Sequence, residues 1–441
     1  MMALRLAYPR VRRMGLRRAS ASAAAVGQST KLTWAQQFRT QPVAYMTIPV
    51  VAAAVGFVTN WAGVKMLFYP LEYFGVDLYR AKDSPWGVAG WQGVVPTKAE
   101  PMGRRLVDII TTKLLRLPEA FERLEPSAMA RLLHAPVIEA IRRDCGAAWA
   151  VALGPVLPWA LCRVVRSLQR DVESVLDVER VVLSAFRADV GLLVELFEEV
   201  GRVELKFLVE SGLVFGFALG LAQMGLWLLA PKPWTLPVAG AVVGYVTNWL
   251  AIKMIFEPVE PLKLLPVPGP MQGLFTVQGL FTKRQPEVSD EFAKFLEERV
   301  LTPQSLLVEL TTGRLASEFD SLLRKAIPFV VPDAVVRAAK RGLVEAAKHP
   351  DQHPQLHEYI KSHLALQPTL SHRLKQLSPP EFEDLLHPVF QEDEITLIIV
   401  GGVLGAAAGG VQYVFGWGGP ARRLAVPVVA YGCLMSLFIY K

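Results

Sequence analysis

The chain has 441 residues, of which 52% are hydrophobic and 20% charged, and its formal net charge is +7. This balance is too apolar for an ordinary soluble protein and too charged for a protein that lies mostly inside a bilayer. Outside the basic N-terminus the charges are mixed, and no zinc, RNP or helix-turn-helix pattern occurs, which excludes nucleic acid as a partner. We expect an all-α integral membrane protein with about five transmembrane helices and two long helical extramembrane regions.

Residues 1–40 form a basic N-terminal segment. No Asp or Glu occurs before Glu72, and six arginines precede a Ser/Ala-rich stretch at 19–25. This composition is typical of an organellar transit peptide, and it favours a mitochondrion over a plastid because arginine outweighs serine. The alternative is a basic cytosolic tail that binds anionic lipid.

Five apolar segments approach the roughly 20 residues that a helix needs to cross the hydrocarbon core. They run over 43–57 with a continuation towards Phe68, and over 211–230, 236–256, 395–415 and 424–440. Short links join the second segment to the third and the fourth to the fifth, so the polar regions at 75–209 and 258–394 must share one side of the membrane. Gly-x-x-x-Gly spacings beginning at Gly216, Gly240 and Gly401 predict close helix packing.

An internal repeat relates the two halves of the chain. Residues 55–72 read VGFVTNWAGVKMLFYPLE and residues 243–260 read VGYVTNWLAIKMIFEPVE, with 11 identities in 18 positions. The similarity continues from 92–98 to 278–283 with one residue lost, which makes Thr97 an insertion before Lys98. We expect a parallel duplication with one unit at 43–230, a second at 236–415, and a C-terminal membrane helix at 424–440.

Both polar regions have helical spacing. In residues 101–115 and 128–143 the apolar side chains fall on one stripe. Prolines interrupt the helices at Pro155 and Pro158 in the first unit and at Pro328 and Pro332 in the second. The stripes are too wide for isolated rods, so these helices must pack on each other, on the other unit or on the membrane surface.

The repeated peptide contains two polar side chains near the end of an apolar helix. These are Thr59 and Asn60 in the first unit and Thr247 and Asn248 in the second. A buried amide in a membrane helix needs a hydrogen-bonding partner. One interpretation is a polar binding site between the two units, and the other is an interhelical hydrogen bond that holds the fold together.

Basic residues follow the repeated peptide. Lys65 and Lys253 lie on a different helix face from the asparagines, where they could contact lipid phosphate or an anionic substrate, or simply extend to the headgroups. Lys98, Lys283 and Arg284 close a glycine-containing loop at a helix start. They are candidates to bind phosphate there, and the alternative is a solvated or headgroup-facing charge.

No catalytic constellation is visible in the sequence. Nucleophile, Walker and Rossmann fingerprints do not occur, so we expect no enzyme activity and no cofactor. His349 and His353 are each followed by proline, which prevents a continuous helix from aligning them with His357 as metal ligands. The three cysteines lie far apart and form no Cys-x-x-Cys pair.

The second copy of the peptide resembles the signature of a membrane-protein family. The residues that carry the resemblance are Thr-Asn-Trp-Leu-Ala-Ile-Lys-Met at 247–254, then Phe256, Pro258 and Pro261, and then Gly-Leu-Phe-Thr-Lys-Arg at 279–284. The family is the domain of unknown function numbered 445, which includes YheB-like proteins of bacteria. The chain departs from its pattern where Thr282 replaces a proline and Gly63 replaces an alanine. The resemblance implies a membrane location and a helical polar domain, and it brings no established activity.

These observations favour a non-enzymatic membrane protein that binds membrane lipid or passes a solute at the interface of its two units. The polar peptide present in both copies is the basis of this hypothesis. The alternative is a scaffold or tether whose projecting helices bind a protein partner.

Overall fold

The computed structural model describes residues 34–40, 42–80, 84–229, 232, 234–263, 276–326 and 331–414. Within these ranges the regular structure is helical apart from two short β-hairpins. The predicted transit peptide, except for its last residues, and the predicted membrane helix at 424–440 lie outside the described residues.

Four of the described helices are long and apolar enough to cross a membrane. They are α3 (Pro42–Phe68), α12 (Arg202–Leu229), α13 (Thr235–Phe256) and α21 (Pro379–Val414), the last of which is apolar over Glu394–Val411. The short helix α2 (Trp34–Thr40) precedes them. A fifth span arises only if α8 (Ala147–Leu153) and α9 (Leu157–Arg170) count together, and these meet at a 69° bend. The predicted all-α membrane class is therefore confirmed.

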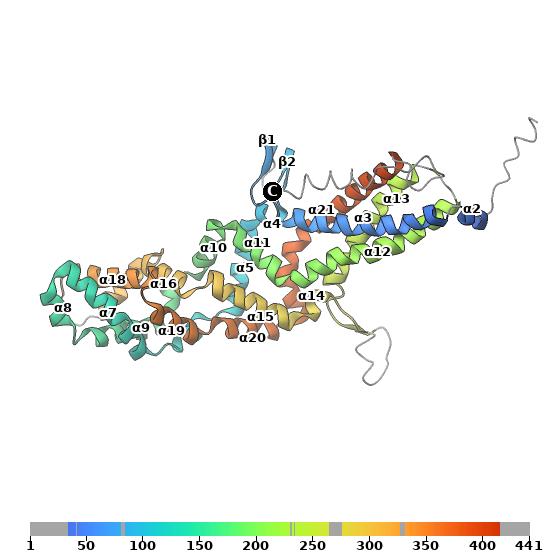
Figure 1. The fold of residues 1–441 in the computed structure, drawn as a ribbon. Coiled ribbons are helices and arrows are strands. Elements are labelled where there is room, and N and C mark those ends of the chain that lie inside the picture. The colour runs from blue at the N-terminus through green and yellow to red at the C-terminus, as the bar shows by residue number, and fades with distance from the viewer. Residues whose placement is uncertain are drawn as a thin grey trace, which may run out of the picture.

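The four long helices form two antiparallel pairs, α3 with α12 and α13 with α21 (Figure 1). Glycine permits their close approach. A Cβ atom added to Gly56 would lie 2.2 Å from the carbonyl oxygen of Gly212, and one added to Gly240 would lie 2.2 Å from that of Gly405. Since no side chain fits at such a distance, the predicted small-residue packing is confirmed.

A hairpin and a short helix follow the first helix of each pair. Strands β1 (Phe74–Arg80) and β2 (Trp86–Trp91) pair antiparallel, as do β3 (Leu262–Lys263) and β4 (Thr276–Val277). Cis peptide bonds precede Pro70 and Pro258. The short helices are α4 (Val94–Thr97) and α14 (Leu280–Lys283). Each hairpin and short helix therefore returns the chain to the end of the membrane helix that precedes it, α3 or α13.

The remaining helices form a lobe that extends beyond the ends of the membrane helices (Figure 1). From the first region come α5 (Ala99–Ile109), the π-helical turn η1 (Ile110–Leu114), α6 (Leu117–Glu122), α7 (Pro126–Cys145), α8, α9, the 3₁₀ turn η2 (Val172–Ser174), α10 (Val178–Ala188) and α11 (Val190–Val200). From the second come α15 (Gln285–Phe295), the π-helical turn η4 (Leu296–Val300), α16 (Pro303–Thr312), α17 (Ala316–Ala326), α18 (Asp333–Lys348), α19 (Pro354–Leu364) and α20 (Leu366–Gln376). The helices predicted at 101–115 and 128–143 are confirmed.

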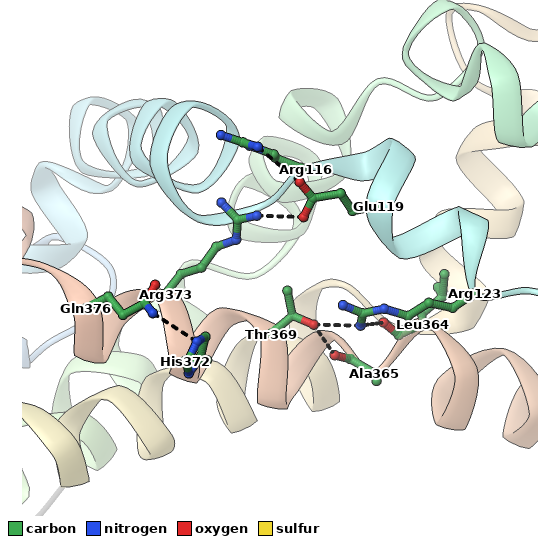
Figure 2. Close-up of polar contacts among 9 residues, drawn as sticks. All are labelled: Arg116, Glu119, Arg123, Leu364, Ala365, Thr369, His372, Arg373 and Gln376. Carbon is green, nitrogen blue, oxygen red and sulfur yellow. Dashed lines mark hydrogen bonds and ion pairs between the residues drawn. The ribbon is translucent and has the colours of Figure 1, made fainter.

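The two polar regions pack on each other and share one hydrophobic core. Helix α18 lies against α7 so closely that a Cβ atom on Gly342 would be 2.6 Å from the carbonyl oxygen of Pro136. Figure 2 shows a second contact between the regions, in which Arg123 donates to the Leu364 carbonyl and Arg373 pairs with Glu119 at 2.6 Å. The wide apolar stripes are thus covered by the other region.

Candidate functional site

The polar pair of the first repeated peptide lies at the contact of α3 with α12. Asn60 is fully buried, and its side-chain nitrogen donates to the Leu208 carbonyl of α12 at 2.6 Å. The Thr59 hydroxyl donates to the Gly56 carbonyl one turn earlier in its own helix. The Asn60 amide therefore links α3 to α12, whereas the Thr59 hydroxyl forms its hydrogen bond within α3.

The second peptide repeats these contacts in the other helix pair. Asn248 donates from its side-chain nitrogen to the Leu397 carbonyl of α21 at 2.7 Å, and Thr247 donates to the Gly244 carbonyl. The amide oxygens of Asn60 and Asn248 are both buried, and neither has a hydrogen-bond partner among the described residues. Each amide nitrogen thus donates inside its own helix pair, and each amide oxygen is left as an acceptor for a ligand.

The equivalent lysines have different partners. The Lys65 ammonium lies 5.0 Å from the centre of the Tyr69 ring, a cation–π contact. Lys253 instead forms an ion pair with Glu257, four residues later in the chain. Tyr69 in turn donates to a Glu198 carboxylate oxygen at 3.0 Å. Neither lysine approaches its asparagine, which agrees with their placement on different helix faces.

The short helices α4 and α14 each have 4 residues between a glycine and a basic residue, so the prediction of an inserted Thr97 is wrong. Gly93 and Gly279 precede the two short helices with φ/ψ of −54°/144° and −51°/136°, and Lys98 and Arg284 follow them with −103°/18° and −98°/18°. Lys98 is therefore equivalent to Arg284, and Thr97 is equivalent to Lys283. The sequence alignment of 92–98 with 278–283 was wrong at this point because it matched lysine to lysine, whereas the backbone matches Lys98 to Arg284.

Arg284 makes the most buried ion pair of this site. Its guanidinium donates at 2.7 Å to Glu204, in the first turn of α12, and only 18% and 5% of the two side chains are exposed. The pair connects the second sequence unit to the first. Lys283 is exposed, and Lys98 is half-buried. The Arg284 guanidinium is thus held by a carboxylate, and phosphate binding by Lys98, Lys283 and Arg284 stays a prediction.

A cavity of about 40 Å³ lies beside this ion pair, between the two helix pairs. Apolar side chains from α3, α11, α12, α13, α14 and α21 form most of its wall, and Glu204 and Glu394 add two carboxylates. One Glu204 oxygen accepts from Arg284, and the other is buried without a hydrogen-bond partner among the described residues. The sequence reasoning missed Glu204, although a carboxylate in the first turn of a spanning helix was a signal for it.

Further charges lie around the ion pair. Burial raises the pKa of Glu291 in α15, while attraction from Arg284 and Arg202 acts in the opposite direction and Glu204 and Glu199 reinforce the increase. Carboxylates and guanidinium groups thus lie together around the ion pair of Arg284 with Glu204.

The fold and the four apolar helices define the class as a helical membrane protein. Residues 238–352, from α13 to just beyond α18, match the family described as "Protein of unknown function (DUF445)". The resemblance of the repeated peptide to that family is thus confirmed for this part of the chain.

Relatives in bacteria carry the name "UPF0754 membrane protein". Those of Bacillus thuringiensis (strain Al Hakam), Bacillus cereus (strain Q1) and Bacillus anthracis (strain A0248) are each 38% identical over 88 residues, which is 20% of this chain and 21% of the relative. The chain thus matches about a fifth of the length of these curated relatives. No solved structure matches the chain.

Proposed function

We propose that this membrane protein binds a lipid or solute that carries a positively charged group, in the cavity between its two helix pairs. The observation that carries the proposal is the Glu204 carboxylate, which is 4% exposed and has one oxygen without a partner on the cavity wall. An unpaired buried polar atom costs on the order of 1–3 kcal/mol, more when it is charged. An ionisable side chain at the edge of the membrane is a default candidate for function.

The cavity suits a small cationic head with apolar surroundings. Two carboxylates, Glu204 and Glu394, lie on the cavity wall, and the Arg284 guanidinium pairs with the first of them. An ammonium group could donate to the free Glu204 oxygen while its alkyl groups meet the apolar wall. The lysines and the two threonines are not needed for this site, and the free amide oxygens of Asn60 and Asn248 stay candidates for a second polar contact.

Binding is tested with methylammonium and with phosphatidylethanolamine, which share a primary ammonium group but differ in source. The purified protein, Glu204→Gln and the control Glu298→Gln, whose parent side chain is exposed, are compared by thermal shift and by native mass spectrometry. We expect the wild type and Glu298→Gln to respond to one of the two probes and Glu204→Gln to lose the response. Equal responses in all three proteins, or none in the wild type, would contradict the proposal.

We propose in addition that the two sequence units arose by duplication. Support comes from the matching contacts of Asn60 with Leu208 and of Asn248 with Leu397. The test is to exchange residues 55–68 and 243–256 between the units. A duplicated architecture should tolerate the exchange, and complete loss of membrane insertion would count against it.

We further propose an organellar membrane, with residues 1–40 acting as a transit peptide. The acid-free, arginine-rich composition supports this location, whereas the relatives named above are bacterial. Sequencing the N-terminus of the mature protein is the test, and an intact Met1 would refute the cleavage.

A further inference from the structure

An uncharged segment lies within the first polar region. From Cys145 to Cys162 the sequence reads CGAAWAVALGPVLPWALC, without a charged or polar side chain in 18 positions. The structure folds this segment into α8 and the start of α9, joined by the turn that contains Pro155. We call residues 145–162 the tip, because α8 lies at the end of the molecule farthest from α2 (Figure 1).

One side of the tip is held in the lobe and the other faces outward. Ala150, Leu157 and Leu161 are buried in the core that the two polar regions share. In contrast, Trp149 is 37% exposed, Val151 76% and Trp159 47%. Large apolar side chains exposed within one short segment mark a binding surface rather than a chance exposure.

The tip is not a membrane span of the ordinary kind. Helix α8 has 7 residues and α9 has 14, and the two are bent by 69°. Their inner faces are already buried against neighbouring helices, so the segment cannot leave the lobe without uncovering the core. Only the outward face is available to another surface.

Arginines flank the tip on both sides. Residues 142–170 contain Arg142, Arg143, Arg163, Arg166 and Arg170, and a single carboxylate, Asp144. Three of these residues are already paired: Arg142 with Glu139 at 3.3 Å, Arg143 with Glu345 at 2.7 Å, and Asp144 with Arg341 at 2.6 Å. Among the described residues, Arg163, Arg166 and Arg170 of α9 form no ion pair.

The Arg163 guanidinium lies 4.9 Å from the centre of the Trp159 ring, so a basic and an aromatic group are presented together. Tryptophan beside arginine, around an apolar patch, is the composition of a surface that lies at lipid headgroups.

We propose that the tip docks into the headgroup region of an anionic bilayer other than the one that α3, α12, α13 and α21 span. Its apolar face would enter the acyl boundary, and the flanking arginines would contact acidic headgroups. Arg163, Arg166 and Arg170 of α9, which have no carboxylate partner among the described residues, favour acidic lipid as the occupant. The protein would thereby connect two membranes. This inference does not depend on the cavity beside Glu204.

The test measures capture of one vesicle population by another. Full-length protein is reconstituted into phosphatidylcholine vesicles, and the outward orientation of the lobe is checked with protease. Protein-free acceptor vesicles contain either phosphatidylcholine alone or phosphatidylcholine with phosphatidylserine, and capture is followed by energy transfer between lipid dyes. Val151→Asp replaces the most exposed large apolar side chain of the tip with a negatively charged one. Ala188→Asp, at an exposed position at the end of α10, is the matched control.

We expect capture of the phosphatidylserine vesicles only, with a decrease at high salt. Val151→Asp should reduce capture about tenfold, because a carboxylate is repelled by the acidic surface and resists entry into it, while Ala188→Asp should capture like the wild type. Failure of the wild type to capture acidic vesicles, or full capture by Val151→Asp, would overturn the proposal. A third acceptor population contains phosphatidylcholine and the reconstituted protein. Capture of this population alone would show that the tip binds a second copy, which overturns the proposal too.

Discussion

Gly244 of α13 and Gly401 of α21 lie in backbone contact, since a Cβ atom on Gly244 would be 2.1 Å from the Gly401 carbonyl oxygen. The same relationship holds between Gly56 and Gly212 in the other helix pair, where the distance is 2.2 Å. Close approach of the backbones lets the amide of the following asparagine reach the facing helix. The small residues and the asparagine of each pair therefore act together.

Adding a methyl group at a glycine contact should separate a helix pair. A Cβ on Gly216 would lie 2.5 Å from the Ala52 carbonyl oxygen, whereas one on Gly225 of the same helix meets nothing within 4 Å. We expect Gly216→Ala to cost about 1–3 kcal/mol of stability, as overpacking does, and Gly225→Ala to be neutral. Thermal unfolding in detergent compares them. Equal melting temperatures would show that the helices accommodate the methyl group.

Removing the interhelical amide should weaken each pair. Asn60→Ala loses the hydrogen bond to the Leu208 carbonyl, and we expect a loss of about 0.5–2 kcal/mol. Asn60→Asp should cost more, because a carboxylate oxygen would face that carbonyl oxygen. Thr59→Val is the control, since its hydroxyl bonds only within α3. A larger loss for the threonine variant would contradict this account.

Glu291 should make stability depend on pH. Burial raises its pKa above the ordinary value of 4.5, so in the folded protein the proton is held more tightly than in the unfolded chain. The ionised form therefore destabilises the fold, and this effect disappears as the pH falls through the folded pKa towards the unfolded one. We expect Glu291→Gln to raise the melting temperature at neutral pH, with the gain shrinking on acidification.

The prediction for Glu291 is checked by thermal melts at a series of pH values, from neutral pH down to the ordinary glutamate pKa of 4.5. Glu298→Gln, from an exposed position in η4, serves as the control. A gain for Glu291→Gln that is the same at every pH would show that the carboxylate charge is not its cause.

Disturbing the contact of α7 with α18 should lower stability more than removing the ion pair of Arg373 with Glu119. Gly342→Ala places a methyl group 2.6 Å from the Pro136 carbonyl oxygen, and we expect a cost of about 1–3 kcal/mol. Arg373→Ala removes a pair with Glu119 whose side chains are 24% and 45% exposed, and it should cost less than about 1 kcal/mol. Hydrogen exchange in α7 and α18 reports the difference. If Arg373→Ala opens these helices more than Gly342→Ala does, the order is reversed.

Much of the fold follows from local patterns. The predicted span 236–256 agrees with α13 to within one residue, whereas α12 begins earlier than the predicted 211–230. Both spans could be predicted because hydropathy is a property of consecutive residues. The helices α5 and α7 were predicted from apolar periodicity for the same reason. The glycine spacing also predicted tight helix contacts, since it needs only the sequence of one helix.

The candidate site was less accessible. The asparagines were recognised as buried amides, and their position in the chain did not tell which carbonyl each would meet. Lys98 was matched to Lys283 because the alignment compared residue types. The backbone angles show that its structural equivalent is Arg284. Glu204 was missed, since only the tertiary structure brings Arg284, the residue after α14, beside the first turn of α12.

The sequence by itself determined the membrane class, the helical spans and the repeated peptide, because each depends on residues close together in the chain. The tertiary structure alone decided that each asparagine donates inside its own helix pair, that Glu204 meets Arg284 at a cavity, and that Trp149 and Trp159 stay exposed at the tip. These features depend on which helices meet. Helix pairing is set by contacts between segments far apart in the chain, which no local pattern contains.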